Sequence, residues 1–440
     1  MKLFLVIILL FLNNCSFDDK TGIWKNEKAL TKKESSLFTD FKTLTGSKSV
    51  FNEIIRLEEN FNFELPKRVN NDKWEDIYYN QFNNSENFNY NGQKNLLFKS
   101  KKISKHNLNS SLLFDKKNLI LADEKGNLIF FSDKENKIIH KFNFYKKKFK
   151  RIKKKINYVL DNTTIFVTDN LGFIYAYDYE QKRILWAKNN KVPFRSNLKI
   201  KDSKLIAADQ NNNILLFNKK DGKILKLIPT EDSKINNSFR NNFSLNENSI
   251  FMLNTYGSLY AIDDKTNNVK WVVNLNQSLD INPNNLFNGN VLVNNNDIIV
   301  VTSHESTFII NSSNGSILKK FNIVSQIKPL IINKYIFLIS TNNLLISINI
   351  QNGEIVYSYN LNQIIANYYN IGEKTAFFKS IMIANDRILI LTQNSYLLEL
   401  ELEGNLKNIF KLSKKVKSNF IFLKNSILYL SYKKRIIILG

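Results

Sequence analysis

The chain has 440 residues, of which 43 % are hydrophobic, a single cysteine and a formal net charge of +24. One cysteine excludes an intrachain disulfide framework and a zinc site built on cysteines. The charge is compatible with an anionic partner, but the lysines are spread along the chain among many asparagines and isoleucines. We therefore interpret most of the charge as a background of composition.

The N-terminus has the features of a secretory signal. Lys2 precedes an unbroken apolar run over residues 3–12, and two asparagines then lead to Cys15. This run is too short for a membrane-spanning helix, which needs about 20 residues. A basic start, a short apolar core and a polar exit are typical of a signal peptide, which we predict over residues 1–14. No later stretch approaches membrane-spanning length.

The position of Cys15 resembles the lipobox of bacterial lipoproteins. Leu12 matches the usual apolar residue three positions earlier, whereas Asn14 departs from the small residue preferred there. The resemblance implies that the Cys15 thiol is acylated, with palmitate as the expected lipid, and becomes the mature N-terminus. It also implies that Ser16, which is not an aspartate, permits export to the outer membrane. The alternative is an incidental cysteine in an ordinary cleaved signal.

Residues 15–70 are polar and lack the repeat found downstream. One stretch around Ser47–Asn60 is compatible with a short helix. We expect a lipid-anchored tether with this short helix, and a disordered tether is the alternative.

An internal repeat occupies residues 71–440. The segments Ile165–Trp186 and Ile250–Trp271 each contain a turn glycine, Gly172 or Gly257, fourteen residues before the tryptophan. Equivalent turn positions recur with an average spacing of about 44 residues, which is a blade-sized unit. They are Gly126, Gly172, Asn212, Gly257, Glu305, Asn343, Ser395 and Lys434.

Three columns of apolar residues accompany these turns. The positions seven before the turn, and three and five after it, are apolar in all eight units, as with Ile165, Tyr175 and Tyr177. A period of two indicates a strand with one buried face. Helical periodicity is absent from Leu119 onward. Units of this length built from short antiparallel strands predict an all-β fold, an eight-bladed β-propeller of four-stranded antiparallel blades.

The second and fourth units carry a more specific pattern. A turn glycine, an apolar-x-Ala-x-Asp strand and a later aliphatic-x-Trp follow one another, as at Gly172, Ala176, Asp178 and Trp186. This pattern resembles the PQQ-like propeller repeat. Eight such units behind a lipoprotein signal resemble the BamB family, a subunit of the bacterial outer-membrane β-barrel assembly machinery. The resemblance implies a non-catalytic scaffold, lipid-anchored in the outer membrane and facing the periplasm.

The segment before the first unit extends this resemblance. Trp74, the pair Asn83-Asn84 and the strand-like Asn95–Ile103 match a segment that, in the family, leads into the ring and gives a strand to the last blade. We therefore predict that Asn95–Ile103 pairs beside Ile436–Leu439. Such an exchange would close the ring and cover sheet edges that the eighth unit otherwise exposes.

The resemblance also implies a partner site. In the family, the connection after the third blade presents an apolar-Arg pair to the periplasmic repeats of the barrel-insertase subunit BamA. The corresponding connection here is Pro229–Leu245, and Phe239 and Arg240 fall where that pair is expected. Aromatic and arginine side chains are common interface anchors. The alternative is that Phe239 packs under the loop while Arg240 faces water.

Catalysis has little support in the sequence. The three histidines are scattered, no nucleotide-binding glycine pattern occurs, and Asp178 and Asp263 precede a turn whose backbone they are expected to bond. Related propellers are PQQ-dependent dehydrogenases, and that resemblance implies a calcium-held quinone, a basic carboxylate and, typically, a vicinal cysteine pair. The cysteine pair is missing here, because Cys15 is the only cysteine. We predict no enzyme activity, no cofactor, no metal and no small-molecule substrate. A PQQ-dependent dehydrogenase and a periplasmic scaffold with a different protein partner remain the alternatives.

The densest basic run is residues 146–155, KKKFKRIKKK. It could contact anionic lipid, with each surface cation contributing about 1 kcal/mol, or it could be a solvated loop. A nucleic-acid partner is not expected for an exported chain.

Overall fold

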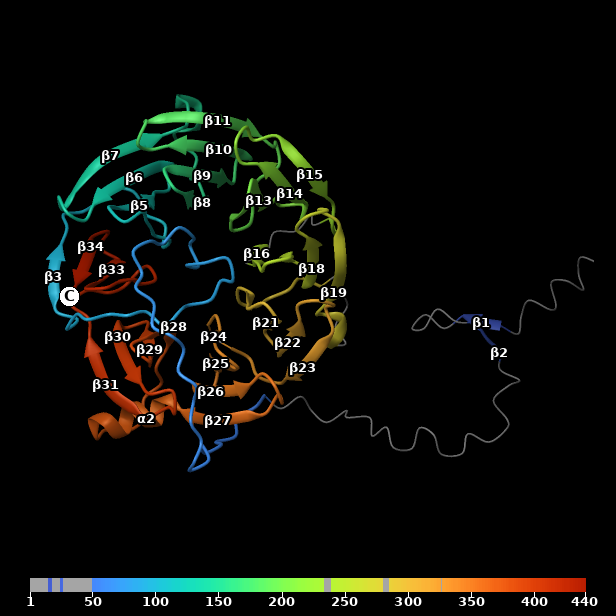
Figure 1. The fold of residues 1–440 in the computed structure, drawn as a ribbon, viewed down its shortest axis with the longest axis vertical. Helices are drawn as coiled ribbons and strands as arrows, with labels where there is room; N and C mark the ends of the chain where they lie inside the picture. The colour runs from blue at the N-terminus through green and yellow to red at the C-terminus, as the bar shows by residue number, and fades with distance from the viewer. Residues whose placement is uncertain (1–14, 18–23, 27–49, 233–238, 280–284, 326) are drawn as a thin grey trace, which may run out of the picture. The chain divides into compact units, whose positions relative to one another are not determined.

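The computed structural model describes residues 15–17, 24–26, 50–232, 239–279, 285–325 and 327–440, so the predicted signal peptide lies outside the described residues. Two compact units are present, residues 1–49 and 50–440. In the first, β1 (Cys15–Phe17) pairs antiparallel with β2 (Trp24–Asn26). The second is a ring of eight four-stranded antiparallel sheets (Figure 1), which confirms the predicted eight-bladed β-propeller.

Each blade orders its strands from the ring centre outward. Blades 1 and 2 are β4 (Leu113–Phe114), β5 (Asn118–Ala122), β6 (Asn127–Ser132), β7 (Lys137–Asn143), and β8 (Ile156–Asp161), β9 (Thr164–Asp169), β10 (Phe173–Asp178), β11 (Arg183–Asn189). Blades 3 and 4 are β12 (Lys199–Lys201), β13 (Lys204–Ala208), β14 (Ile214–Asn218), β15 (Ile224–Ile228), and β16 (Asn242–Leu245), β17 (Ser249–Leu253), β18 (Ser258–Asp263), β19 (Val269–Asn274). Blades 5 and 6 are β20 (Val293–Asn294), β21 (Ile298–Thr302), β22 (Thr307–Asn311), β23 (Ile317–Phe321), and β24 (Leu330–Ile332), β25 (Tyr335–Ile339), β26 (Leu344–Asn349), β27 (Ile355–Asn360). Blades 7 and 8 are β28 (Phe378–Ala384), β29 (Arg387–Thr392), β30 (Tyr396–Leu400), β31 (Leu406–Lys411), and β32 (Ile421–Leu423), β33 (Ser426–Leu430), β34 (Ile436–Leu439), β3 (Leu96–Lys99).

The three apolar columns form the core of the blades. The column before each turn lies in the second strand of a blade, and the two columns after it lie in the third strand. Every member is buried except Tyr260, which is partly exposed. These two strands are therefore covered on both faces by neighbouring blades, which is why they form the most continuous apolar runs of the propeller. The first column consists of Leu119, Ile165, Leu205, Ile250, Ile298, Ile336, Ile388 and Ile427.

The turn that anchors each unit has a shared conformation. Seven of the eight positions have a positive φ: Gly126, Gly172, Asn212, Gly257, Asn343, Ser395 and Lys434. The fifth turn, at Glu305, differs because Thr302 pairs directly with Thr307, which makes this turn one residue shorter than the fourth, where Leu253 pairs with Leu259. The unit at Glu305 is nevertheless a complete blade.

A polar side chain three residues before the turn position stabilises most of these turns. In blade 2, Asp169 Oδ1 accepts hydrogen bonds from the N–H groups of Leu171 and Phe173 at 2.8 and 2.9 Å. Asp, Asn, Ser or Thr occupies this position in all eight blades, and in seven of them its side chain accepts from the backbone N–H four residues later. A pattern of apolar residues alone does not reveal it. The seven residues are Asp123, Asp169, Asp209, Asn254, Ser340, Thr392 and Ser431.

The tryptophan and the second glycine of the repeat meet across adjacent blades. Trp186, in the outer strand of blade 2, donates its indole N–H to the carbonyl of Lys219 at 2.9 Å. A Cβ atom at Gly222, where φ is +68°, would lie 2.5 Å from the Trp186 ring. The glycine therefore lets the ring of one blade lie on the turn of the next, and Trp271 and Gly315 repeat the arrangement.

The ring closes as predicted. Strand β3 pairs antiparallel with β34, with Leu96 opposite Leu439, and becomes the outer strand of blade 8 (Figure 1). Asn95 and Gly440 exchange two backbone hydrogen bonds of 2.9 Å. The sheet is thus completed by a strand from the opposite end of the chain.

Two local expectations were wrong. Residues 50–60 contain no helix: Ile55 instead exchanges backbone hydrogen bonds with Ser358 on β27, and Phe63 is buried in the core of blades 6 and 7. Among the described residues, Phe51 already donates its N–H to the carbonyl of Asn322 and packs against the blades, so part of the predicted tether belongs to the propeller, which was expected to start at residue 71. A helix, α2 (Leu361–Tyr369), connects blades 6 and 7, although no helical pattern was recognised there.

Candidate functional site

The centre of the ring is occupied by residues 71–90, hereafter the central segment (Figure 1). Its first part joins the inner strands of two blades. The backbone of Trp74 exchanges hydrogen bonds of 2.8 and 2.9 Å with Phe114 in blade 1, and the N–H of Leu160 in blade 2 donates to the carbonyl of Glu75 at 2.9 Å. The central segment therefore extends the innermost layer of the propeller.

Two asparagines connect the central segment to the opposite side of the ring. The fully buried Asn83 amide donates to the carbonyls of Phe243 and Leu292, at 2.8 and 2.9 Å, in blades 4 and 5. Asn84 donates to the carbonyl of Ile331 in blade 6 and accepts from its N–H. The pair that suggested the family resemblance therefore holds the central segment to three blades.

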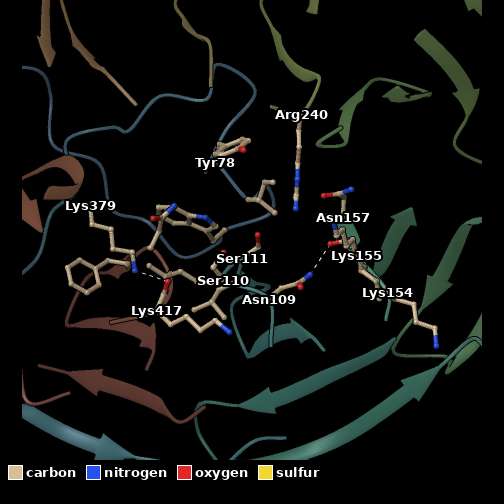
Figure 2. A pocket seen from close by; sticks show the side chains of 17 residues that line it. Tyr78, Asn109, Ser110, Ser111, Lys154, Lys155, Asn157, Arg240, Lys379 and Lys417 are labelled. Carbon is tan, nitrogen blue, oxygen red and sulfur yellow. Dashed lines mark hydrogen bonds between the residues drawn. The ribbon is translucent and has the colours of Figure 1, made fainter. Parts of the chain in front are cut away.

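A pocket of about 320 Å³ lies in the middle of the ring, beside the central segment (Figure 2). Tyr78 and Trp74 of the central segment form part of its wall, and segments that precede or begin the inner strands of several blades form the rest. Five cationic side chains line it, and none of the described residues that line it is an aspartate or glutamate. The cations are Lys154, Lys155, Arg240, Lys379 and Lys417. The pocket is called the central pocket below.

None of these five cations forms an ion pair with a described residue. Lys379 Nζ donates instead to the carbonyls of Val416 and Lys417, at 2.9 and 2.7 Å. Lys417 Nζ also donates to a carbonyl, that of Leu108. Carbonyl dipoles stabilise an ammonium less than a carboxylate does, so the pocket keeps a net positive charge.

Burial lowers the pKa of three lysines that line the pocket. Burial, together with the positive charge of Lys417, lowers the pKa of Lys379 to about 8. The pKa of Lys417 is lowered by burial and by Lys434, although Glu124 acts in the opposite direction. Burial also lowers the pKa of Lys154. Each shift shows that the protonated form lacks full compensation in the folded chain.

The structure places the two predicted partner-binding residues in different surroundings. Phe239 is only 7 % exposed and packs edge-on against Phe287, with ring centroids 5.1 Å apart. Arg240 is exposed, and its side chain points into the central pocket (Figure 2). A partner could therefore reach Arg240, whereas Phe239 belongs to the core of blades 4 and 5.

The aspartates at the second turn have the structural role expected of them. Asp178 Oδ1 accepts from the N–H of Gln181 at 2.9 Å, and Asp263 Oδ1 accepts from the N–H of Thr266 at 2.8 Å. Among the described residues, no group of three or more His, Cys, Asp or Glu side chains could hold a metal ion. No helix in the described part of the chain is long and apolar enough to cross a membrane.

The basic run has two parts. Lys147, within the short 3-10 helix η3 (Lys147–Phe149), is exposed, and so are most cations of the run. The last two residues differ: Lys154 is buried and Lys155 lines the central pocket. The sequence could not separate them because the run looks uniform.

The repeat, the turn geometry and the tryptophan–glycine contacts define a PQQ-like β-propeller whose centre is filled by its own chain. A family model described as outer membrane protein assembly factor BamB matches residues 146–359, which span blades 2 to 6. The predicted resemblance to the BamB family is therefore confirmed. No curated protein sequence matches the chain significantly.

Solved structures agree on the fold. BamB from Moraxella catarrhalis is similar with a TM-score of 0.59 and 10 % identity, covering 78 % of this chain and 99 % of that one. A quinohemoprotein alcohol dehydrogenase from Comamonas testosteroni has a TM-score of 0.59 and 8 % identity, covering 84 % and 81 %. The enzyme ADHIIG from Pseudomonas putida HK5 has a TM-score of 0.60 and 7 % identity, covering 86 % and 83 %. At these identities the likeness concerns the fold alone, which is shared by an assembly factor and by enzymes.

Proposed function

We propose that this chain is a non-catalytic scaffold lipoprotein of the outer-membrane β-barrel assembly machinery. The observation that carries the proposal is the match of the assembly-factor family model to five consecutive blades, residues 146–359. In this proposal Cys15 carries the lipid anchor, and the ring faces the periplasm. The partner is the set of periplasmic repeats of a BamA-like insertase.

The filled ring supports a binding role. Enzymes need a site where substrate meets reactive groups, but here the central segment is hydrogen-bonded to the inner strands of all eight blades. What a rigid ring of this kind offers is a set of loops held in fixed positions, which is where scaffolds carry recognition.

We assign the partner contact to Arg240 and a supporting role to Phe239. Arg240 is exposed near the end of the connection between blades 3 and 4, and its planar guanidinium suits carbonyls or a carboxylate of a partner. Phe239, packed against Phe287, fixes the point at which that connection enters blade 4.

Co-purification from detergent-solubilised envelopes tests the proposal. The tagged chain should recover the insertase, and Arg240→Ala should reduce recovery roughly thirtyfold, as expected for loss of about 2 kcal/mol at an interface anchor. Arg240→Lys should restore little, because it loses the planar fork. Arg183→Ala, at an exposed arginine on the outer strand of blade 2, is the matched control and should leave recovery unchanged.

Phe239→Ala separates packing from binding. It should lower the melting temperature, since a buried phenylalanine replaced by alanine costs about 3–5 kcal/mol. Absence of the insertase from every preparation would contradict the proposal, and recovery of a different periplasmic protein would favour the alternative scaffold. Oxidation of alcohols by the purified chain in the presence of the quinone would favour the enzyme.

A further inference from the structure

The central pocket differs from several buried cationic positions of the molecule. Lys199 forms an ion pair of 2.7 Å with Asp76, Lys204 one of 3.0 Å with Asp264, and Lys94 one of 3.1 Å with Glu399. All of these ammonium groups are largely shielded from solvent. The fold thus supplies a carboxylate to buried lysines at several places, but it supplies none in the wall of the central pocket.

The pocket cations reach one space from separate parts of the ring. Lys155 precedes β8 of blade 2, Arg240 precedes β16 of blade 4, Lys379 lies in β28 of blade 7, and Lys417 precedes β32 of blade 8. Arg240 points toward the middle of the pocket (Figure 2). Its guanidinium and the Lys155 ammonium have no hydrogen-bond or ion-pair partner in the described part of the chain.

Neutral donors complete the wall. Asn109, Ser111 and Asn157, from the inner layer of blades 1 and 2, also line the pocket (Figure 2). Such groups can bond an oxygen-rich anion without adding charge. A volume of about 320 Å³ is at the small end of the range for ligand pockets, so it would admit a small anion or a headgroup.

We propose that the central pocket is a binding site for a phosphate-bearing anion, with Arg240 and Lys155 as its principal ligands and Lys379 and Lys417 as supporting charges. A phosphate group carries about −1.5 to −2 charges near neutral pH and three acceptor oxygens, which several cations can share. A single carboxylate carries only one negative charge, so it would balance less of the positive charge of the pocket. This proposal goes beyond the scaffold function, because it gives the chain a small-molecule ligand that it can bind without a protein partner.

Calorimetric titration of the purified full chain with inorganic pyrophosphate is the direct test. We expect saturable binding at one site, weakened about tenfold by Arg240→Gln and by Lys155→Gln, since each removes a charge-assisted hydrogen bond. Lys147→Gln is the matched control: it is exposed in the same basic run but does not line the pocket, and it should change affinity less than twofold. Melting temperatures of all variants check that the fold is retained.

Two comparisons refine the ligand class. Inorganic phosphate should bind more weakly than pyrophosphate, and acetate should not bind measurably. Vesicles containing phosphatidylglycerol identify the source: binding that pyrophosphate displaces and Arg240→Gln weakens supports a lipid headgroup, whereas pyrophosphate binding without vesicle binding supports a free phosphate compound.

Three results would overturn the proposal. They are no saturable pyrophosphate binding at low salt, an equal loss in the Lys147→Gln control, and acetate or an acidic peptide binding as tightly as pyrophosphate. The assay contains no insertase, so its failure would leave the proposed scaffold function untouched.

Discussion

Closure of the ring by β3 can be tested with a reversible cross-link. Leu96 lies opposite Leu439, next to the doubly hydrogen-bonded pair Asn95 and Gly440. Leu96 and Leu439 therefore form a non-hydrogen-bonded pair, whose Cα atoms lie about 4.5 Å apart in antiparallel sheets. That separation is within disulfide reach. Leu96→Cys with Leu439→Cys, in a Cys15→Ser background, should oxidise in the folded chain.

The expected gain follows from the length of the loop. The bridge would close a loop of roughly 340 residues, for which the chain-entropy relation gives about 6 kcal/mol at 25 °C. The 391 residues from Val50 to Gly440 imply an unfolding entropy of about 0.8 kcal/mol/K, so the oxidised protein should melt about 7 °C above the same protein after reduction. Comparing the two redox forms cancels the cost of replacing the buried Leu439.

Calorimetry with and without reductant gives this difference. Leu428→Cys with Ile438→Cys is the matched control, because it bridges one hairpin and closes a loop of only about ten residues, worth about 3 kcal/mol. The reasoning would be refuted if the 96–439 thiols stayed reduced in the folded protein. It would also be refuted if the oxidised and reduced forms melted together while the hairpin control shifted.

Three further predictions concern the interior. Asn83→Ala removes two buried hydrogen bonds and leaves two carbonyls without a donor, so urea unfolding should show a loss of about 2–4 kcal/mol; an unchanged midpoint would mean that the asparagine does not hold the central segment. Gly222→Ala should cost about 1–3 kcal/mol, because φ is +68° and the new methyl group would meet Trp186; equal stability would argue against that contact. The pKa of Lys379 in the folded chain, about 8, lies below its usual 10.5. Between these two pH values the unfolded chain binds more protons than the folded chain, so the free energy of unfolding should rise with pH. Lys379→Met should flatten this slope in denaturation curves at pH 8–10.5, and an identical slope would contradict the shift.

The blades could be predicted because their signal is local. Apolar residues with a period of two around a turn, such as Ile165, Tyr175 and Tyr177, indicate a buried strand face from the sequence of one unit alone. The closing strand was predicted from the family resemblance and from the unpaired edge that the last unit would otherwise leave. The helix α2 was missed because nine residues give little periodicity; its Asn360 cap, which accepts from two backbone N–H groups, was the available signal.

The site depended on contacts that no local pattern records. Asn83 bonds carbonyls that are 160 and 209 residues further along the chain. The cations of the central pocket come from different blades, so neither Lys379 nor Arg240 indicates the other in the sequence. The burial of Phe239 likewise depends on Phe287, which belongs to the next connection.

The central claim, that the chain serves β-barrel assembly, is tested most directly by the amount of folded β-barrel protein in the outer membrane of cells that lack it. Folded and unfolded barrels can be quantified by their different mobility before and after heating. The account predicts a fall in folded barrels that the wild-type chain restores and the Arg240→Ala variant restores poorly. Unchanged amounts of folded barrels in cells without the chain would contradict it.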